Sequence, residues 1–132
     1  MIKRETGDRE RATDLGVVKI SNEAISAIAS TAALEVPGVA KLGGGIGRTI
    51  YDLLTKKGAS RGIRINMKDG EIRLSVSVIV EYGIDIPRIA DEVQESVKRA
   101  VERMTGLVLS EVDVLVEGVN PPASDKNSRR NV

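Results

Sequence analysis

The sequence contains no cysteine and no histidine among its 132 residues. Without cysteine, the chain offers no disulfide, no thiolate nucleophile and no structural zinc site of the usual kind. Without histidine, it also lacks the commonest metal ligand and the commonest general base at neutral pH. Only carboxylate, lysine, tyrosine and hydroxyl chemistry remains, and we expect no metal site and no cofactor.

Aromatic residues are almost as scarce, since phenylalanine and tryptophan are absent and tyrosine occurs twice. Hydrophobic residues still make up 41% of the chain, so the core must consist of Val, Ile, Leu and Ala. Few aromatic surfaces are then left for stacking bases or sugars. A chain of this length is expected to form one domain that buries roughly two thirds of its unfolded surface.

Long hydrophobic runs are also missing from the sequence. No run approaches the roughly 20 apolar residues that a membrane-spanning helix requires. Residues 1–16 mix charges of both signs and contain no apolar segment typical of a secretory signal. We therefore expect a cytoplasmic protein that would reach a membrane only through a partner.

The net charge is only +1, but the charges are unevenly distributed along the chain. Residues 37–68 contain seven basic residues and one acid, a balance of +6, whereas residues 69–117 contain five basic residues and eleven acids, a balance of −6. Two oppositely charged parts favour head-to-tail self-association, or an acidic partner at the basic part. The candidate partner or anion contacts are Lys41, Arg48, Lys56, Lys57, Arg61 and Arg64.

The first half of the sequence predicts a flexible arm over residues 1–14, a strand over residues 15–20 and a long helix. Ser21 and Asn22 offer N-cap oxygens to this helix, which is expected to end before a linker that begins at Pro37. After the triglycine, residues 50–58 favour a short amphipathic helix. The apolar face of the long helix contains Ile25, Ile28, Ala29, Ala32, Ala33 and Val36.

The second half predicts a hairpin, a second long helix and a last strand. Apolar and polar residues alternate on both sides of Asp69 and Gly70, a pair typical of a tight turn. Asp85 can cap the second long helix, and Gly106 can end it. The apolar face of that helix contains Ile86, Ile89, Ala90, Val93, Val97, Ala100, Val101 and Met104.

These elements, in the order β-α-α-β-β-α-β, predict an α+β fold. We expect a two-layer sandwich in which two long helices and one short helix cover one face of a mainly antiparallel sheet of three to four strands. Residues 15–119 would form this single domain, and residues 120–132 would be a disordered tail.

Strict alternation in the last strand predicts Val108, Val112, Val114 and Val116 on one face. The opposite face would carry two leucines within an acidic row, and with an isoleucine of the preceding strand they would form an exposed apolar island. The second long helix adds acidic positions that could face another copy. The candidate self-association residues are therefore Glu92, Glu95, Glu102, Ile79, Leu109 and Leu115.

No set of residues indicates catalysis. Asp91 and Glu95 would share one face of the second long helix, but they alternate with Lys98 and Arg99 as on an ion-paired surface that faces solvent. The sequence therefore predicts a protein that is not an enzyme.

Three segments resemble the bacterial alkaline shock protein family, also described as general-stress or envelope-stress proteins: ISNEAISAIASTAALEVPGVAKL, VIVEYGIDIPRIADEVQESVKRAVERMTGL and SEVDVLVEGV. The resemblance covers roughly residues 16–119. It implies a small cytoplasmic scaffold or regulatory protein that acts through self-association and protein contacts. It also implies that a membrane-anchored protein is a possible partner, and it brings no catalytic residues.

A different interpretation rests on Gly44, Gly45, Gly47 and Arg48. Residues 44–47 match the GXXG pattern with which KH domains hold a nucleic-acid backbone, and they lie between two predicted helices. The order of the surrounding elements is also that of one KH class. A KH-like module that binds single-stranded RNA is therefore the alternative hypothesis, although any triglycine loop readily contains GXXG and the first helix is long for a KH domain.

Overall fold

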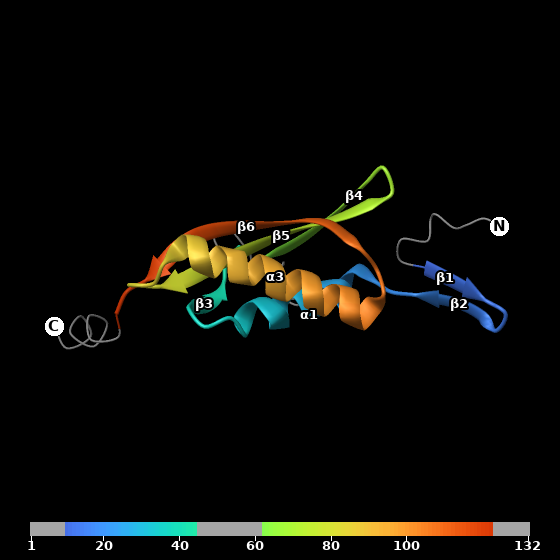
Figure 1. The fold of residues 1–132 in the computed structure, drawn as a ribbon, viewed down its shortest axis with the longest axis horizontal. Coiled ribbons are helices and arrows are strands. Elements are labelled where there is room, and N and C mark those ends of the chain that lie inside the picture. The colour runs from blue at the N-terminus through green and yellow to red at the C-terminus, as the bar shows by residue number, and fades with distance from the viewer. Residues whose placement is uncertain (1–9, 45–61, 123–132) are drawn as a thin grey trace, which may run out of the picture.

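The computed structural model describes residues 10–44 and 62–122 (Figure 1). Its elements are, in order, β1 (Glu10–Thr13), β2 (Gly16–Lys19), α1 (Asn22–Leu34), β3 (Val39–Leu42), β4 (Ile63–Lys68), β5 (Glu71–Glu81), α3 (Ile86–Thr105) and β6 (Leu109–Asn120). The predicted short helix at residues 50–58 lies outside the described residues, as do the predicted tail from residue 123 onward and residues 1–9 of the predicted arm.

The main sheet is organised around β5, which pairs with three other strands. Both β3 and β4 run antiparallel along one edge of β5, with β3 opposite residues 78–80 and β4 opposite residues 71–76. The other edge of β5 pairs with β6 in parallel, because α3 carries the chain back to the end where β5 began. The sheet is thus mainly antiparallel, as predicted, with one parallel pair.

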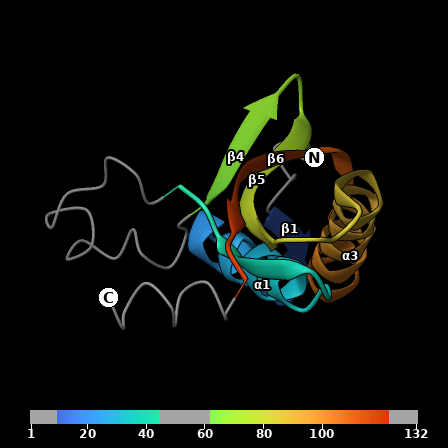
Figure 2. The same cartoon turned by 90° about the vertical axis from the view of Figure 1, so that its left-hand side faces the viewer.

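Helices α1 and α3 pack against each other and cover one face of this sheet (Figure 2). Alternate side chains of β5 point into the core beneath the helices and are at most 2% exposed: Ile72, Leu74, Val76, Val78 and Val80. The helices contribute small residues such as Ala29 and Ala33, which let α1 lie close to the sheet. The described residues therefore form the predicted α+β arrangement of two layers.

The predicted capping groups begin both helices and end α3, whereas α1 ends at Leu34, earlier than predicted. The Ser21 hydroxyl accepts a hydrogen bond from the backbone N–H of Ala24 at 3.1 Å, and the Asp85 carboxylate accepts one from the N–H of Arg88. Gly106 adopts a left-handed φ of 77° after α3, which favours glycine, and its N–H donates to the carbonyl of Glu102.

The N-terminal region contains one strand more than the sequence predicted. Residues 10–13 of the predicted flexible arm form β1, which pairs with β2 in a separate two-stranded sheet. The Thr13 hydroxyl stabilises the connecting turn by accepting from the N–H of Leu15 and donating to the carbonyl of Gly16. The sequence pattern did not predict this strand, because its residues are mostly charged or polar and neither of its faces is apolar.

The structure also places β3 within the linker expected after Pro37. This strand has only four residues, and a pairing irregularity at Ala40 interrupts its alternation, so no period-two pattern marks it in the sequence. The turn before β3 requires glycine at position 38. Its φ is 106°, and a Cβ atom there would lie 2.8 Å from Cδ1 of Ile89 in α3.

Two bulges interrupt the alternation of β6, and the first overturns the predicted faces of Val108 and Leu109. Ile72 pairs with Leu109 but Arg73 pairs with Glu111, so Ser110 is an extra residue; Glu117 is a second one. Leu109 consequently faces the core and is 2% exposed, whereas Val108 is 75% exposed. The prediction that put Val108 in the core and Leu109 on the outer face is therefore wrong.

Two residues of the predicted apolar face of α3 are also exposed. Ile86 and Met104 lie in the first and last turns of the helix, and Met104 is 69% exposed. The central positions Ile89, Val93, Val97 and Val101 are buried as predicted. Helical spacing identifies the inward direction, but it does not show where the sheet beneath the helix ends.

Candidate protein-interaction surface

The face of the main sheet opposite α1 and α3 is covered by no helix or strand of the described residues (Figure 2). We name it the open sheet face. Its side chains alternate with the buried ones along each strand and are half-buried or exposed. It comprises Lys41, Arg64, Asn66, Lys68, Glu71, Arg73, Ser75, Ser77, Ile79, Glu111, Asp113, Leu115 and Glu117.

The strand register arranges these side chains in rows across the sheet. In one row, Arg64 of β4 pairs with Ser75 of β5, which pairs with Asp113 of β6. In the next row, Ser77 pairs with Leu115, while the N–H of Ser77 donates to the carbonyl of Gly62 at 2.8 Å. Both rows therefore have a small serine in the middle and larger groups on one or both sides.

Charge divides the open sheet face lengthwise. Lys41, Arg64 and Lys68 lie on the edge formed by β3 and β4, and β6 carries three acids on the opposite edge: Glu111, Asp113 and Glu117. Described residues of the two oppositely charged parts of the sequence thus lie on opposite edges of one surface, and the ion pair of Arg73 with Glu71 lies between them on β5. Such a division orients an approaching charged partner.

Some of these charged groups already have partners within the chain. Glu111 lies 3.9 Å from Arg73, and the Glu117 carboxylate accepts a hydrogen bond from the N–H of Gly44 at 2.8 Å. Arg64 and Asp113 have no ion-pair partner among the described residues. These two exposed charges are available to a second molecule.

The middle of the open sheet face is hollowed. An open hollow of about 350 Å³ lies over Ser75 and Ser77. Gly44 and Gly62 border it, and Gly62 has a φ of 79°, a conformation that favours glycine. The remaining lining residues are Ile63, Arg64, Leu115 and Glu117.

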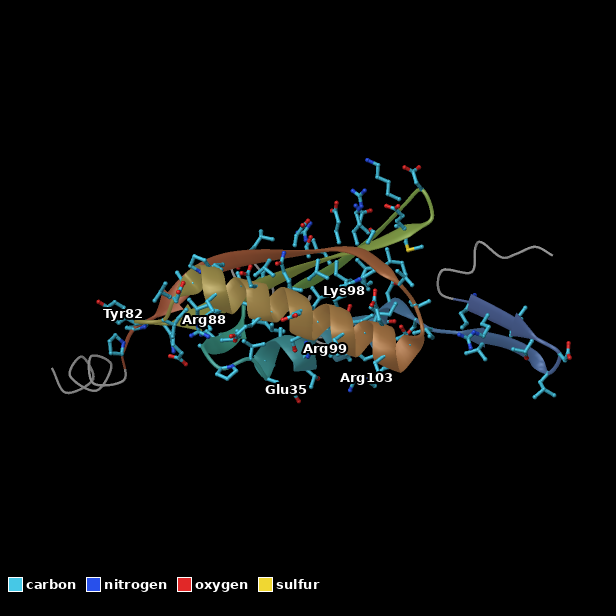
Figure 3. All side chains as sticks on the ribbon, viewed as in Figure 1. Glu35, Tyr82, Arg88, Lys98, Arg99 and Arg103 are labelled. Atoms are coloured by element: carbon cyan, nitrogen blue, oxygen red, sulfur yellow. The ribbon has the colours of Figure 1, made fainter. Side chains whose placement is uncertain are left out.

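The candidate acids on α3 belong to the helical layer and not to the open sheet face. Arg88 and Glu92 form an ion pair at 2.8 Å, and Lys98 and Glu102 form another at 2.7 Å. Figure 3 shows Arg88 and Lys98 along the same helix. Glu95 is exposed and has no ion pair within the described part of the chain.

Glu102 also connects α3 to β6. Its carboxylate accepts the N–H of Leu109 at 2.8 Å, and Lys98 donates to the carbonyl of Leu109 at 3.0 Å. The hydrogen bond from Lys98, followed by the one from the Leu109 backbone, lowers the pKa of Glu102 below its ordinary value. This carboxylate therefore has a structural role at the start of β6.

The structure brings together only some of the predicted interaction residues. Lys41, Arg64, Ile79 and Leu115 share the open sheet face, whereas Leu109 is in the core. Arg48, Lys56, Lys57 and Arg61 lie outside the described residues. The sequence did not identify Asp113 and the two serines as interaction residues, because only the strand register shows that Ser75 and Asp113 share a row with Arg64 and that Ser77 lies in the next row.

The position of Gly44 does not match the KH alternative. A KH loop joins two helices, but Gly44 lies two residues after the end of strand β3, which separates it from α1. Gly45, Gly47 and Arg48 lie outside the described residues. The element order on which the RNA-binding hypothesis relied is therefore wrong on the N-terminal side of the loop.

The β1–β2 hairpin carries a second exposed apolar feature, which the sequence did not predict. Leu15, Val17 and Val18 of the β1–β2 hairpin are exposed, and the hairpin projects beyond the helices (Figure 1). Among the described residues, no helix combines the length and the hydropathy needed to cross a membrane.

Fold and surface together define a small α+β module with one helix-covered sheet face and one open, charge-divided sheet face. The chain belongs to the alkaline shock protein 23 family, which is described as having a cell envelope-related function and matches residues 10–121. This finding confirms the family resemblance in the sequence.

Curated relatives match most of the chain. It is 33% identical over 107 residues to the uncharacterized protein YqhY of Bacillus subtilis, covering 81% of this chain and 79% of YqhY. It is 32% identical over 112 residues to the uncharacterized protein YloU of the same species, covering 83% of this chain and 93% of YloU. A stress response regulator gls24 homolog of Streptococcus pyogenes is 26% identical over 102 residues, covering 76% of this chain but only 57% of that relative.

Solved structures offer a weaker likeness. A MamM CTD variant aligns with a TM-score of 0.46 and 20% identity, covering 74% of this chain and 98% of that one. A likeness at this level carries no argument about function.

Proposed function

We propose that this protein is a non-enzymatic scaffold or regulatory protein of the bacterial stress response at the cell envelope, acting through self-association and protein contacts. The open sheet face is the observation that carries the proposal. Family membership supports the cell envelope setting, and the relative named as a stress response regulator supports the stress setting.

The shape of the open sheet face suits a protein partner. Sheets pack face to face about 10 Å apart, and the side chains of the two facing surfaces interdigitate. Here Ile79 and Leu115 offer apolar contact, while the two serines leave space between larger neighbours. A second protein surface fills such an area more completely than a small ligand does.

The charges on the open sheet face would orient an approaching partner and raise the rate of association. The basic side, with Lys41 and Arg64, would contact an acidic surface, and the acidic side of β6 would contact a basic one. Attraction between exposed charges is screened over a Debye length of about 10 Å at 0.1 M salt. Association at this face should therefore weaken as the salt concentration rises.

The charged groups of α3 support a role without catalysis. Arg88 pairs with Glu92 and Lys98 pairs with Glu102 along the helix, as is typical of a surface that stabilises its own helix. We further propose that the protein works in the cytoplasm and reaches the membrane by binding a membrane-anchored partner.

Two sets of variants test this proposal. The open-face set carries Lys41→Glu with Arg64→Glu, and the control set carries Arg99→Glu with Arg103→Glu on α3 (Figure 3), so both change the net charge equally. Self-association of the purified proteins is measured at low and high salt, and partner capture is measured by affinity purification from the native cell. The proposal predicts that the open-face set loses association and capture at low salt while the control set keeps them. It is wrong if the open-face set behaves like the parent protein in both measurements.

A further inference from the structure

Building on the proposed function, we infer that the partner at the open sheet face is a second copy of this chain. The two copies face each other across a two-fold axis that runs parallel to β5 and passes above it. The charge division of the face and the register of β4, β5 and β6 carry this inference.

The charge division selects the direction of the axis. Rotation by half a turn about an axis parallel to the strands exchanges the two edges of the sheet, so β4 of one copy faces β6 of the other. Rotation about an axis that crosses the strands would leave β4 facing β4 and β6 facing β6. Only the first arrangement places the basic edge opposite the acidic edge, and the second would place like charges together.

The register then selects the pairs of residues. Rotation about an axis parallel to the strands does not move a residue along the strand direction, so residues of the same row face each other. Arg64 and Asp113 share a row through Ser75. Arg64 therefore faces Asp113 of the partner subunit, and the same contact occurs a second time by symmetry.

The hollow on the open sheet face is complementary to Leu115 in the same arrangement. Leu115 shares its row with Ser77 and Gly62. Because the rotation exchanges the edges, the partner's Leu115 lies opposite Gly62, at the border of the hollow over Ser77. The exposed Leu115 and the hollow thus meet twice in the dimer, and burying the leucine removes apolar surface from water.

Such an interface is isologous and closes on itself as a dimer. At the axis the open-face side chains of β5 meet their own copies: Ser75 and Ser77 permit close approach of the two sheets, and each Arg73 faces its copy while it stays beside Glu71 and Glu111 of its own chain. Arg64 and Asp113, which have no ion pair among the described residues of one copy, both gain one in the dimer.

Complementary charge reversal tests this geometry. Arg64→Asp places two acids opposite each other twice in a homodimer, and Asp113→Arg does the same with two arginines. For each variant alone, the dissociation constant of the dimer should be at least about tenfold higher than that of the parent protein. Mixing the two variants should restore the dimer, because the aspartate introduced at position 64 of one copy then faces the arginine introduced at position 113 of the other, and the unaltered pair also matches.

Sedimentation velocity of each variant and of the mixture at low salt measures the outcome, and circular dichroism verifies that each variant is folded. Arg99→Asp and Glu95→Arg on α3, separately and mixed, are the matched controls and should dimerise like the parent. The inference is overturned if the single open-face variants dimerise normally, or if their mixture stays as monomeric as the separate variants. If the parent protein is itself monomeric while open-face variants still lose partner capture, this inference fails and the proposed function stands.

Discussion

Leu109 and Leu115 lie on the same strand at an even spacing, yet Leu109 is 2% exposed in the core and Leu115 is 47% exposed on the open sheet face. The extra residue Ser110 causes this difference, because it shifts the pairing of β6 with β5 by one position. One bulge therefore decides which leucine stabilises the fold and which remains available to a partner.

Truncation of the two leucines should have unequal effects on stability. Leu109→Ala leaves a cavity in the core and should lower the free energy of unfolding by about 2–5 kcal/mol. Leu115→Ala removes an exposed side chain and should change it by less than about 0.5 kcal/mol in the monomer. Urea unfolding at low protein concentration measures both values. Similar losses for the two variants would show that the assigned faces of β6 are incorrect.

Replacement of Glu102 by glutamine should change how stability depends on pH. The hydrogen bond from Lys98 lowers the folded-state pKa of Glu102 from its ordinary 4.5, so the ionised carboxylate stabilises the fold above pH 4.5. This contribution is lost as the pH falls through the lowered folded-state pKa. The parent protein should thus exceed Glu102→Gln in unfolding free energy at neutral pH, and the difference should shrink in acid.

Urea titrations at several pH values follow this difference. Glu95→Gln on the same helix is the control, since Glu95 has no ion pair among the described residues, and its effect should stay nearly constant. A difference for Glu102→Gln that does not vary with pH would contradict the assigned role of the carboxylate.

Alanine should be tolerated less well at position 38 than at position 83. Both glycines have a positive φ, 106° at Gly38 and 95° at Gly83, so both variants incur backbone strain. Only at position 38 would the new Cβ meet another side chain, because Cδ1 of the buried Ile89 lies 2.8 Å away and nothing lies within 4 Å at Gly83. Ile89→Val removes Cδ1 and should reduce the extra loss caused by Gly38→Ala. Thermal unfolding of the single and double variants measures these losses of stability. Equal losses of stability for Gly38→Ala and Gly83→Ala would exclude the steric explanation.

Salt should weaken the self-association of the parent protein, whereas truncation of Leu115 should weaken it at every salt concentration. Ion pairs such as Arg64 with the partner's Asp113 are screened as the Debye length falls from about 10 Å at 0.1 M to about 3 Å at 1 M. Leu115→Ala loses apolar contact and should associate less than the parent at both salt concentrations. Sedimentation equilibrium yields the dissociation constants, and association of the parent that is indifferent to salt would speak against the charged contacts.

Features that depend on neighbouring residues could be predicted from the sequence. Asp85 and Gly106 mark the ends of α3, and Asp69 with Gly70 marks the turn between β4 and β5, because each acts within a few residues of itself. The alternation of apolar and polar residues along β5 likewise identified its core positions.

Features that depend on pairing between distant residues could not be predicted. The bulge at Ser110 arises from the fit of β6 against β5, and no local pattern records it. The short strand β3 becomes visible only through its partner. The row that joins Arg64, Ser75 and Asp113 likewise exists only in the assembled sheet, so the candidate surface was predicted in part.

Cross-linking through single cysteines tests most directly whether the open sheet face is the association surface. The chain contains no cysteine, so Ser75→Cys on β5 and the control Ala27→Cys on the exposed side of α1 each introduce one thiol. With a short bis-maleimide reagent at low salt, the account predicts a covalent dimer from Ser75→Cys and little from Ala27→Cys. Equal yields from the two variants, or a higher yield from Ala27→Cys, would contradict it.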